Sequence, residues 1–234
     1  MSISSRMQKL DWTKISEDLM GRGFAVTDRL LLDDEMESLK AGYGQDDLYR
    51  KTIVMQRFSM GRGEYKYFRY PLPDVVQELR ERFYEKLAPL ANEWCSRLAL
   101  DIHYPLLHKD FLAECAVAGQ EVPTPLILHY GKGDYNCLHQ DLYGKVWFPF
   151  QVIFGLSDES DYQGGELVLT KQRPRLQSIP YVLRIPKGSA LVTTTNFHAE
   201  KGVRGFYRAP MKHGVAEVTS GERYTLGLIF HDSQ

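Results

Sequence analysis

The order of apolar and polar residues predicts a helix-rich first half and a strand-rich second half. In the first half, apolar residues recur three or four positions apart, which is the spacing of one helix face. Aspartates precede two of these runs, and we expect Asp33 or Asp34, and Asp74, to cap the helices that follow. The expected helices cover residues 11–20, about 34–41, 75–100 and 106–118.

From Pro125 onward, short apolar runs are separated by glycine and proline pairs, a pattern typical of an antiparallel sandwich or jelly roll. The expected strands cover residues 126–130, 152–154, 166–170, 181–185, 190–195, 214–218 and 224–230. The predicted fold class is therefore α+β. We expect a single domain, residues 1–234, in which a helix-rich part, 1–122, buttresses a β-core, 123–234.

One stretch of the first half has a different character, because residues 53–70 favour two strands joined around Gly61 to Gly63. This β-hairpin lies in the most basic and aromatic part of the sequence, with Arg50, Lys51, Arg57, Arg62, Lys66 and Arg69 in or beside it. Two interpretations stay open. The hairpin is a lid that stacks on or clamps a substrate, or it is an ordinary amphipathic hairpin with solvated charges.

Composition narrows the classes of partner. The 234 residues suffice for one substantial core, and a net charge of −1 with a pI near 6.7 excludes a global polybasic field. An anionic partner must therefore meet a local patch. Cys95, Cys115 and Cys137 are too few for a disulfide framework, and no stretch reaches membrane-spanning length. Both observations favour a reducing cytoplasm.

Candidate chemistry gathers between Leu128 and Leu142, where His139 and Asp141 are two residues apart. On an extended strand both side chains point to the same face and offer a metal one imidazole and one carboxylate. His213 supplies a second imidazole from the start of the expected strand 214–218. Two histidines and one carboxylate form the facial triad that holds Fe(II) and leaves coordination positions open.

A candidate anion site follows ten residues after His213. Arg223 and Thr225 share one face of the expected strand 224–230 and are predicted to point inward together. A buried arginine needs an anion, and the distal carboxylate of 2-oxoglutarate would accept a bidentate contact from the guanidinium. The alternative is a surface arginine at the start of a strand.

Together these residues resemble a known superfamily. The set His139-x-Asp141, His213 and Arg223-x-Thr225 is similar to that of the Fe(II)/2-oxoglutarate-dependent dioxygenases, whose shared fold is the double-stranded β-helix. Within it, the segments 134–144, 164–175, 211–214 and 226–232 resemble a bacterial 2OG-Fe(II) oxygenase family described as acting on damaged nucleic acid. The resemblance runs from about Tyr49 to Asp232. It implies that His139, Asp141 and His213 bind Fe(II) and that 2-oxoglutarate and dioxygen are co-substrates.

Two subfamily patterns meet in this sequence. Tyr130, nine residues before His139, resembles the cofactor-binding tyrosine of AlkB-type nucleic-acid demethylases, which implies a hydrogen bond to 2-oxoglutarate. The AlkB pattern has an asparagine where this chain has Leu128. A basic residue ten positions after the second histidine, here Arg223, is instead the prolyl-hydroxylase-like pattern.

Residues around the triad carry weaker signals. Cys137 shares the parity of His139, so it either lines the pocket or is a small buried side chain, whereas Asn136 and Gln140 have the opposite parity and are expected to support the site or face solvent. The remaining histidines are expected to be structural, and four of them are expected to be ordinary surface or core residues without a carboxylate partner: His103, His108, His129 and His198.

Two basic segments outside the hairpin are candidate contacts for an anionic substrate. Arg173 and Arg175 follow an expected strand, and their alternative is solvated loop charge. Farther on, basic and aromatic residues accumulate in a pattern that favours phosphate contact and base stacking. They are Lys201, Arg204, Arg208 and Lys212 with Phe197, Phe206 and Tyr207.

The sequence therefore predicts an Fe(II)- and 2-oxoglutarate-dependent dioxygenase, a hydroxylase or oxidative demethylase, that acts on nucleic acid or a nucleotide-like substrate. One alternative is a prolyl-hydroxylase-like enzyme that hydroxylates a protein side chain or a small metabolite. The other is a jelly-roll binding module without catalysis.

Overall fold

The computed structural model describes residues 2–141 and 144–234 and combines helices with antiparallel sheets. The helices come early in the chain, as predicted. They are α1 (Ile3–Met7), α2 (Trp12–Arg22), α3 (Asp33–Gly42), α4 (Asp74–Arg97) and α5 (His108–Val117), with short 3₁₀ turns η1 (Asp46–Leu48) and η2 (Met55–Phe58). None of the helices in the described ranges is both long and apolar enough to cross a membrane.

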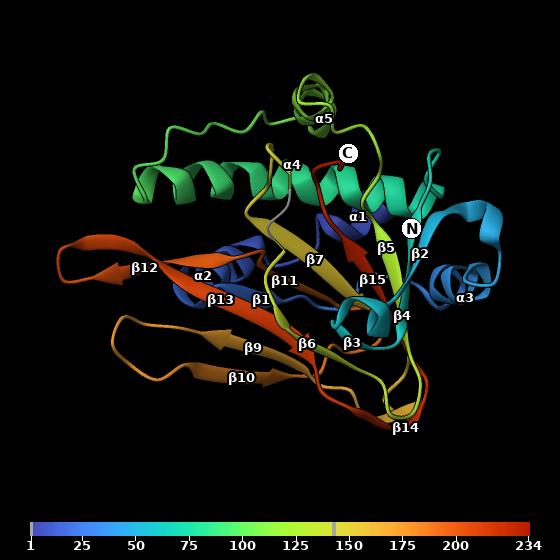
Figure 1. Cartoon of the computed structure of the whole chain (residues 1–234). Coiled ribbons are helices and arrows are strands. Elements are labelled where there is room, and N and C mark those ends of the chain that lie inside the picture. Colours follow the sequence, from blue (N-terminus) through green and yellow to red (C-terminus); the bar gives the residue numbers. More distant parts are fainter. Residues whose placement is uncertain (1, 142–143) are drawn as a thin grey trace.

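The larger sheet joins strands from both halves of the sequence (Figure 1). Within the described residues it has seven strands, all paired antiparallel. Segments from the helix-rich part form both of its edges. The order is β1 (Phe24–Val26), β11 (Ala190–Thr194), β7 (Phe150–Gly155), β15 (Arg223–Leu228), β5 (Leu126–Tyr130), β4 (Glu64–Phe68) and β2 (Tyr49–Val54).

A second antiparallel sheet carries most of the remaining strands. Its order is β10 (Ile179–Leu183), β9 (Leu167–Lys171), β13 (Gly205–Val215), β6 (Tyr135–His139) and β3 (Gly61–Arg62), and β12 (Phe197–Gly202) forms a hairpin with β13. A further small ladder pairs β8 (Tyr162–Gly164) with β14 (Val218–Gly221). An apolar cluster that includes Ile153, Leu167 and Met211 joins strands of the two larger sheets.

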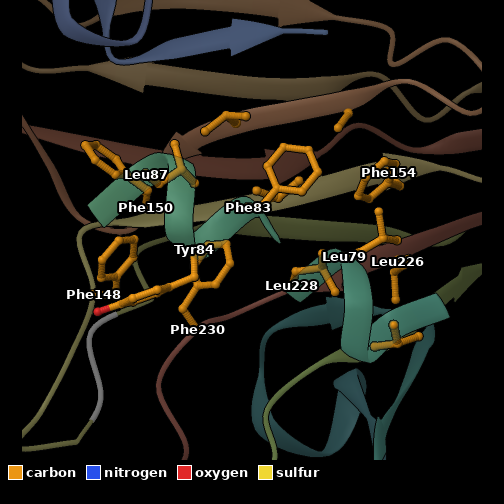
Figure 2. Close-up of a cluster of buried hydrophobic side chains, with 14 of the residues drawn as sticks. Leu79, Phe83, Tyr84, Leu87, Phe148, Phe150, Phe154, Leu226, Leu228 and Phe230 are labelled. Atoms are coloured by element: carbon orange, nitrogen blue, oxygen red, sulfur yellow. The ribbon is translucent and has the colours of Figure 1, made fainter. Parts of the chain in front are cut away.

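One face of the larger sheet packs toward the second sheet, and helix α4 covers the opposite face. The prediction that N-terminal helices buttress a sheet is therefore confirmed. Most of the predicted apolar stripe of α4 is buried, with Leu90 and Leu98 only partly so, and burial of each large side chain contributes about 1.5–3 kcal/mol. Figure 2 shows this contact, in which Leu79, Phe83, Tyr84 and Leu87 of α4 meet Phe148, Phe150, Phe154, Leu226, Leu228 and Phe230.

The two predicted aspartate caps are wrong. Leu32 and Pro73 occupy the cap positions, and Asp33 and Asp74 are the first residues inside α3 and α4. In α3 the free N–H group of Leu32 donates instead to the carboxylate of Glu35, at 2.8 Å. The acidic residues still lie in the first turn, where they interact favourably with the positive end of the helix dipole.

The two strands expected at residues 53–70 are present, but the segment that connects them is more than a simple turn. Strands β2 and β4 pair antiparallel, but η2 and β3 lie between them. Gly61 and Gly63 have φ angles of +121° and +112°, which favour glycine, and they let β3 leave the larger sheet and pair with β6 of the second sheet. The segment therefore bridges the two sheets.

The expected strand at 214–218 is also divided, because β13 ends at Val215 and β14 begins at Val218. The register of β13 against β6 shifts between His213 and Val215, which is a local irregularity of the ladder. The strand expected at 181–185 lies two residues earlier, at Ile179–Leu183.

Candidate metal centre and adjoining pocket

The three predicted ligand residues come together between β6 and β13. His139 ends β6 and is the Cα partner of His213, which lies near the end of β13 rather than at the start of a strand. Asp141 follows β6, and its backbone N–H donates to the Thr195 carbonyl at 2.9 Å. One ligand atom from each side chain lies within 4.8 Å of the others, so among the described residues this group could hold a metal ion.

The pKa shifts of His139 and Asp141 favour the protonation states that bind a metal cation. The Nδ1–H group of His139 donates to the Cys137 carbonyl at 2.7 Å, which leaves Nε2 available 3.5 Å from Asp141 Oδ1. Burial lowers the pKa of His139, and the neighbouring His213 lowers it further. Burial raises the pKa of the Asp141 carboxyl, but the two imidazoles and the Gln151 amide outweigh it and lower that pKa to about 2. A neutral imidazole and an ionised carboxylate are the states that bind metal.

Gln151 is a site residue that the sequence reasoning missed. Its side-chain amide donates to Asp141 Oδ2 at 2.8 Å from a buried position on β7. The same carboxylate oxygen lies 3.2 Å from His213 Nε2. A polar residue between Phe150 and Val152, in a strand otherwise read as apolar core, is the signal that could have identified it.

A pocket with a volume of about 420 Å³ adjoins the cluster and is lined by both sheets. Arg223, Thr225 and Tyr130 all line it and are buried, as predicted for Arg223 and Thr225. In the register of β15 on β5, Arg223 faces Tyr130 and Thr225 faces Leu128. The alternative of a surface arginine is therefore wrong.

The guanidinium of Arg223 is only partly satisfied by the described residues. The guanidinium carbon lies 5.6 Å from the centre of the Tyr130 ring, and Nη1 is buried without a hydrogen-bond partner among the described residues. A buried cation without a partner carries a large desolvation penalty. Burial raises the pKa of Tyr130 to about 12 although Arg223 opposes the shift, so the phenol is a neutral hydrogen-bond donor. The pocket thus offers several donors to an anion.

Two tyrosines from β4 complete the wall of the pocket. Tyr65 and Tyr67 line it, and burial raises the pKa of both phenols, with a further contribution from the carboxylate of Asp141. The sequence predicted them in a hairpin that was either a lid over a substrate or an ordinary amphipathic hairpin. Their position on a central pocket wall follows from the pairing of β4 with β5, a long-range contact that the local pattern does not encode.

Several secondary expectations need correction. Cys137 is exposed and lines the pocket, so the alternative of a small buried side chain is wrong. Asn136 and Gln140 also line it despite their opposite parity, and Gln140 donates to the Asn196 carbonyl. His198 does have a nearby carboxylate, because its Nδ1 lies 2.7 Å from Glu200 Oε2.

The basic segments lie away from the pocket wall. Arg173 and Arg175 follow β9, and Lys201, Arg204, Arg208 and Lys212 lie on or beside the β12–β13 hairpin. Figure 1 shows this hairpin projecting to one side of the molecule. None of these side chains lines the pocket in the described part of the chain.

Residues 63–233 match the Oxygenase-NA family, described as "oxygenase, catalysing oxidative methylation of damaged DNA". The chain belongs to this family. Two curated relatives are uncharacterized proteins from two strains of Mycobacterium tuberculosis, CDC 1551 / Oshkosh and ATCC 25618 / H37Rv. Each is 45% identical over 197 residues, which cover 84% of this chain and 79% of the relative.

Solved structures share the fold at low sequence identity. A prolyl-4-hydroxylase from Pseudomonas putida has a TM-score of 0.58 at 13% identity and covers 95% of this chain and 100% of that one. A 2OG-Fe(II) oxygenase family oxidoreductase from Burkholderia pseudomallei has a TM-score of 0.56 at 15% identity, with coverages of 96% and 93%. The family confirms the prediction of an enzyme, an oxygenase, and the solved structures show that the chain shares their fold.

Proposed function

We propose that this oxygenase binds Fe(II) through His139, Asp141 and His213 and binds the distal carboxylate of 2-oxoglutarate through Arg223, with Thr225 and Tyr130 as hydrogen-bond donors. The observation that carries the proposal is the state of Arg223, a buried cation with an unpartnered nitrogen in a pocket shared with the His-Asp-His cluster. A dicarboxylate that reaches both features satisfies the guanidinium and occupies the metal.

The residues present fit both groups. Two imidazoles and a carboxylate are a suitable donor set for Fe(II), and they leave positions for a chelating co-substrate and dioxygen. When bound, the two groups supply the oxidation: dioxygen and 2-oxoglutarate give succinate and carbon dioxide, and a substrate C–H bond becomes C–OH. The chain orients the co-substrate through Arg223, and it holds the Asp141 carboxylate in place through Gln151.

We also propose the finer architecture. The two facing sheets would form the double-stranded β-helix, with residues 123–234 as its core and the whole chain as one domain. Support comes from the way strands of both sheets line one pocket and from the contribution of β1, β2 and β4 to the larger sheet. A cytoplasmic location belongs to the same proposal, because Cys95, Cys115 and Cys137 are all free thiols.

For the primary substrate we propose nucleic acid, in line with the family's description. On an N-methyl carbon, hydroxylation leads to loss of formaldehyde and a demethylated base, whereas on an ordinary carbon the alcohol remains. The likeness to prolyl hydroxylases keeps a protein side chain as the second candidate.

Release of succinate tests the catalytic proposal. The full chain with Fe(II) and 2-oxoglutarate, without a further substrate, is expected to form succinate above the level of free iron. His139→Ala is expected to form none above that level, and to lose Mn(II) binding measured by electron paramagnetic resonance. Equal succinate release by the two proteins would remove the assignment of the metal ligands.

A further inference from the structure

The pocket opens beside a segment to which the proposed chemistry assigns no role. We call residues 57–62 with Tyr135 and Leu138 the pocket rim. Arg62 is the Cα partner of Tyr135 in the β3–β6 ladder, and the Cys137 N–H donates to the Met60 carbonyl at 2.9 Å. Met60 and Leu138 also line the pocket, and Leu138 is the direct neighbour of His139. The rim is therefore continuous with the metal centre.

The rim exposes large apolar side chains that a folded chain normally buries. Phe58 is 55% exposed, Leu138 46%, Met60 41% and Tyr135 38%. Single exposed apolar residues are common, but Met60 and Leu138 are exposed and also line the pocket, and Phe58 lies two residues before Met60; such a group favours a binding surface. Two of the four present flat aromatic rings.

The charges on the rim have one sign. Arg57 and Arg62 are exposed, and neither forms an ion pair within residues 2–141 and 144–234. No acidic residue occurs in the segment 55–62. The same segment thus combines two free guanidinium groups with an exposed ring, although the chain as a whole has a net charge of −1.

We propose that the pocket rim binds a single-stranded nucleic-acid segment, with Phe58 stacked on a base next to the target and Arg57 and Arg62 in contact with phosphates. The inference rests on the proposed function, because it assumes that the target base enters the pocket beside His139. Exposed rings interleaved with guanidinium groups are the features that bind single strands without sequence preference. Uniform positive charge favours an anionic strand over a peptide, which carries no phosphate for the two arginines.

A flexible strand suits the geometry better than a duplex. The pocket reaches the metal cluster from a mouth lined by Met60 and Leu138, and a base inside a helix cannot enter such a cavity unless it leaves the stack. An unpaired strand needs no such extrusion. We therefore expect single-stranded oligonucleotides to bind more tightly than duplexes of the same length.

The salt dependence of binding separates phosphate contacts, which depend on salt, from base stacking, which does not. The probe is a fluorescein-labelled twelve-nucleotide oligothymidylate, followed by anisotropy at several salt concentrations. The full chain is loaded with 2-oxoglutarate and with Mn(II) in place of iron, so that no turnover occurs. For single strands, log K falls with log salt by about 0.7 per phosphate contact. The double variant Arg57→Gln, Arg62→Gln is therefore expected to flatten the slope by about 1.4.

Phe58→Ala is expected to act differently from the arginine variants. Loss of one stacked base weakens binding by about 5-fold to 150-fold, with the salt slope unchanged. Phe58→Trp keeps a ring at the same position and is expected to restore binding. The matched control is Lys109→Gln, which removes an exposed charge from α5, a helix that lies beyond α4 from the sheets (Figure 1) and does not line the pocket.

Three results would overturn the inference. They are no binding of oligothymidylate by the unmodified chain, equal binding by the chain and its rim variants, and loss of binding on Arg204→Gln in the β12–β13 hairpin without loss in the rim variants. Succinate release without substrate is measured on the same preparations. If it persists while oligothymidylate does not bind, the rim inference fails and the oxygenase assignment stands; if it is absent, the proposed function itself fails.

Discussion

The two faces of the larger sheet use the same strands for opposite purposes. Along β7, Phe150, Val152 and Phe154 pack in the cluster beneath α4, while Gln151 and Ile153 line the pocket. Along β15 the alternation continues in the same way, with Leu226 and Leu228 in the core and Arg223, Thr225 and Gly227 in the pocket. Because successive side chains point to opposite faces, one strand sequence encodes the core and the site together.

Two buried arginines show what this difference means energetically. Arg80 on α4 donates to the carbonyls of Ile229 and Phe230 and pairs with Asp232 at 2.8 Å. Arg223 on the pocket face keeps a buried nitrogen without such a partner in the described chain. The first arginine is satisfied by the fold, so it stabilises the C-terminal segment. We propose that the second is satisfied when 2-oxoglutarate binds.

The largest expected effect contrasts these arginines. Arg80→Met leaves Asp232 buried without its partner and is expected to lower the free energy of unfolding by about 3–5 kcal/mol. Arg223→Met removes an unsatisfied buried charge, so the unfolding free energy of the ligand-free chain is expected to stay the same or rise, while 2-oxoglutarate binding is lost. Urea unfolding and calorimetric titration measure the two quantities. Equal destabilisation by both substitutions would contradict the comparison.

The control for Arg80 lies one half-turn away on the same helix. Arg82 forms an exposed ion pair with Glu85, at 3.1 Å. Such pairs contribute about 0.2–1 kcal/mol, so Arg82→Met is expected to have little effect on urea unfolding.

Neighbouring positions on β7 sharpen the comparison further. Phe154→Ala opens a cavity in the core under α4 and is expected to cost about 3–5 kcal/mol of unfolding free energy. Ile153→Ala enlarges a pocket that already exists, so it is expected to cost less than Phe154→Ala and to change the Michaelis constant for 2-oxoglutarate or substrate. A larger stability loss for Ile153→Ala would show that the pocket face carries the core instead.

We expect the free energy of unfolding to fall in acid because of a histidine on the helix-covered side of the larger sheet. Burial, and then Arg80, lowers the pKa of His108 from 6.5 to about 3. Below pH 6.5 the unfolded chain therefore binds a proton at His108 that the folded chain does not bind. The free energy of unfolding is highest above pH 6.5 and falls as the pH is lowered toward 3. The loss due to His108 is about 2 kcal/mol between pH 6.5 and 4.5.

Substitution of this histidine tests the source of the acid sensitivity. His108→Gln can keep a donor for the Phe230 carbonyl, which His108 Nε2 contacts at 2.8 Å, and is expected to flatten the pH dependence of urea unfolding. His103→Gln, at an exposed position, is the matched control and is expected to change nothing. An unchanged pH dependence in His108→Gln would place the titrating group elsewhere.

The smallest expected effect concerns Gln151. Gln151→Leu removes the donor that orients Asp141, and loss of such a support weakens metal binding by about 10-fold to 100-fold. Mn(II) titration by electron paramagnetic resonance measures the change, and Gln151→Glu tests whether a carboxylate at this position weakens the site as well. Metal affinity equal to that of the unmodified chain would mean that Asp141 is held by its backbone contact to Thr195 alone.

Local patterns in the sequence determined the element types and pointed to the three side chains of the candidate metal cluster. The helical stripe of α4, the short strands after Pro125 and the spacing of His139 and Asp141 all depend on contacts or parity within a few residues. The assignment of His213 and Arg223 needed only their residue types and distance along the chain. Cap positions were misjudged, because an aspartate just inside a helix and one at the cap look alike in sequence.

Tertiary structure alone decided which side chains share the pocket. The pairing of β4 with β5 brings Tyr65 and Tyr67 to its wall, the burial of β7 brings Gln151 to Asp141, and the crossing of β3 to the second sheet sets Arg62 beside Tyr135. The β4–β5 and β3–β6 pairings join segments that lie far apart along the chain. Their formation depends on the packing of whole sheets, so no local periodicity could have predicted them.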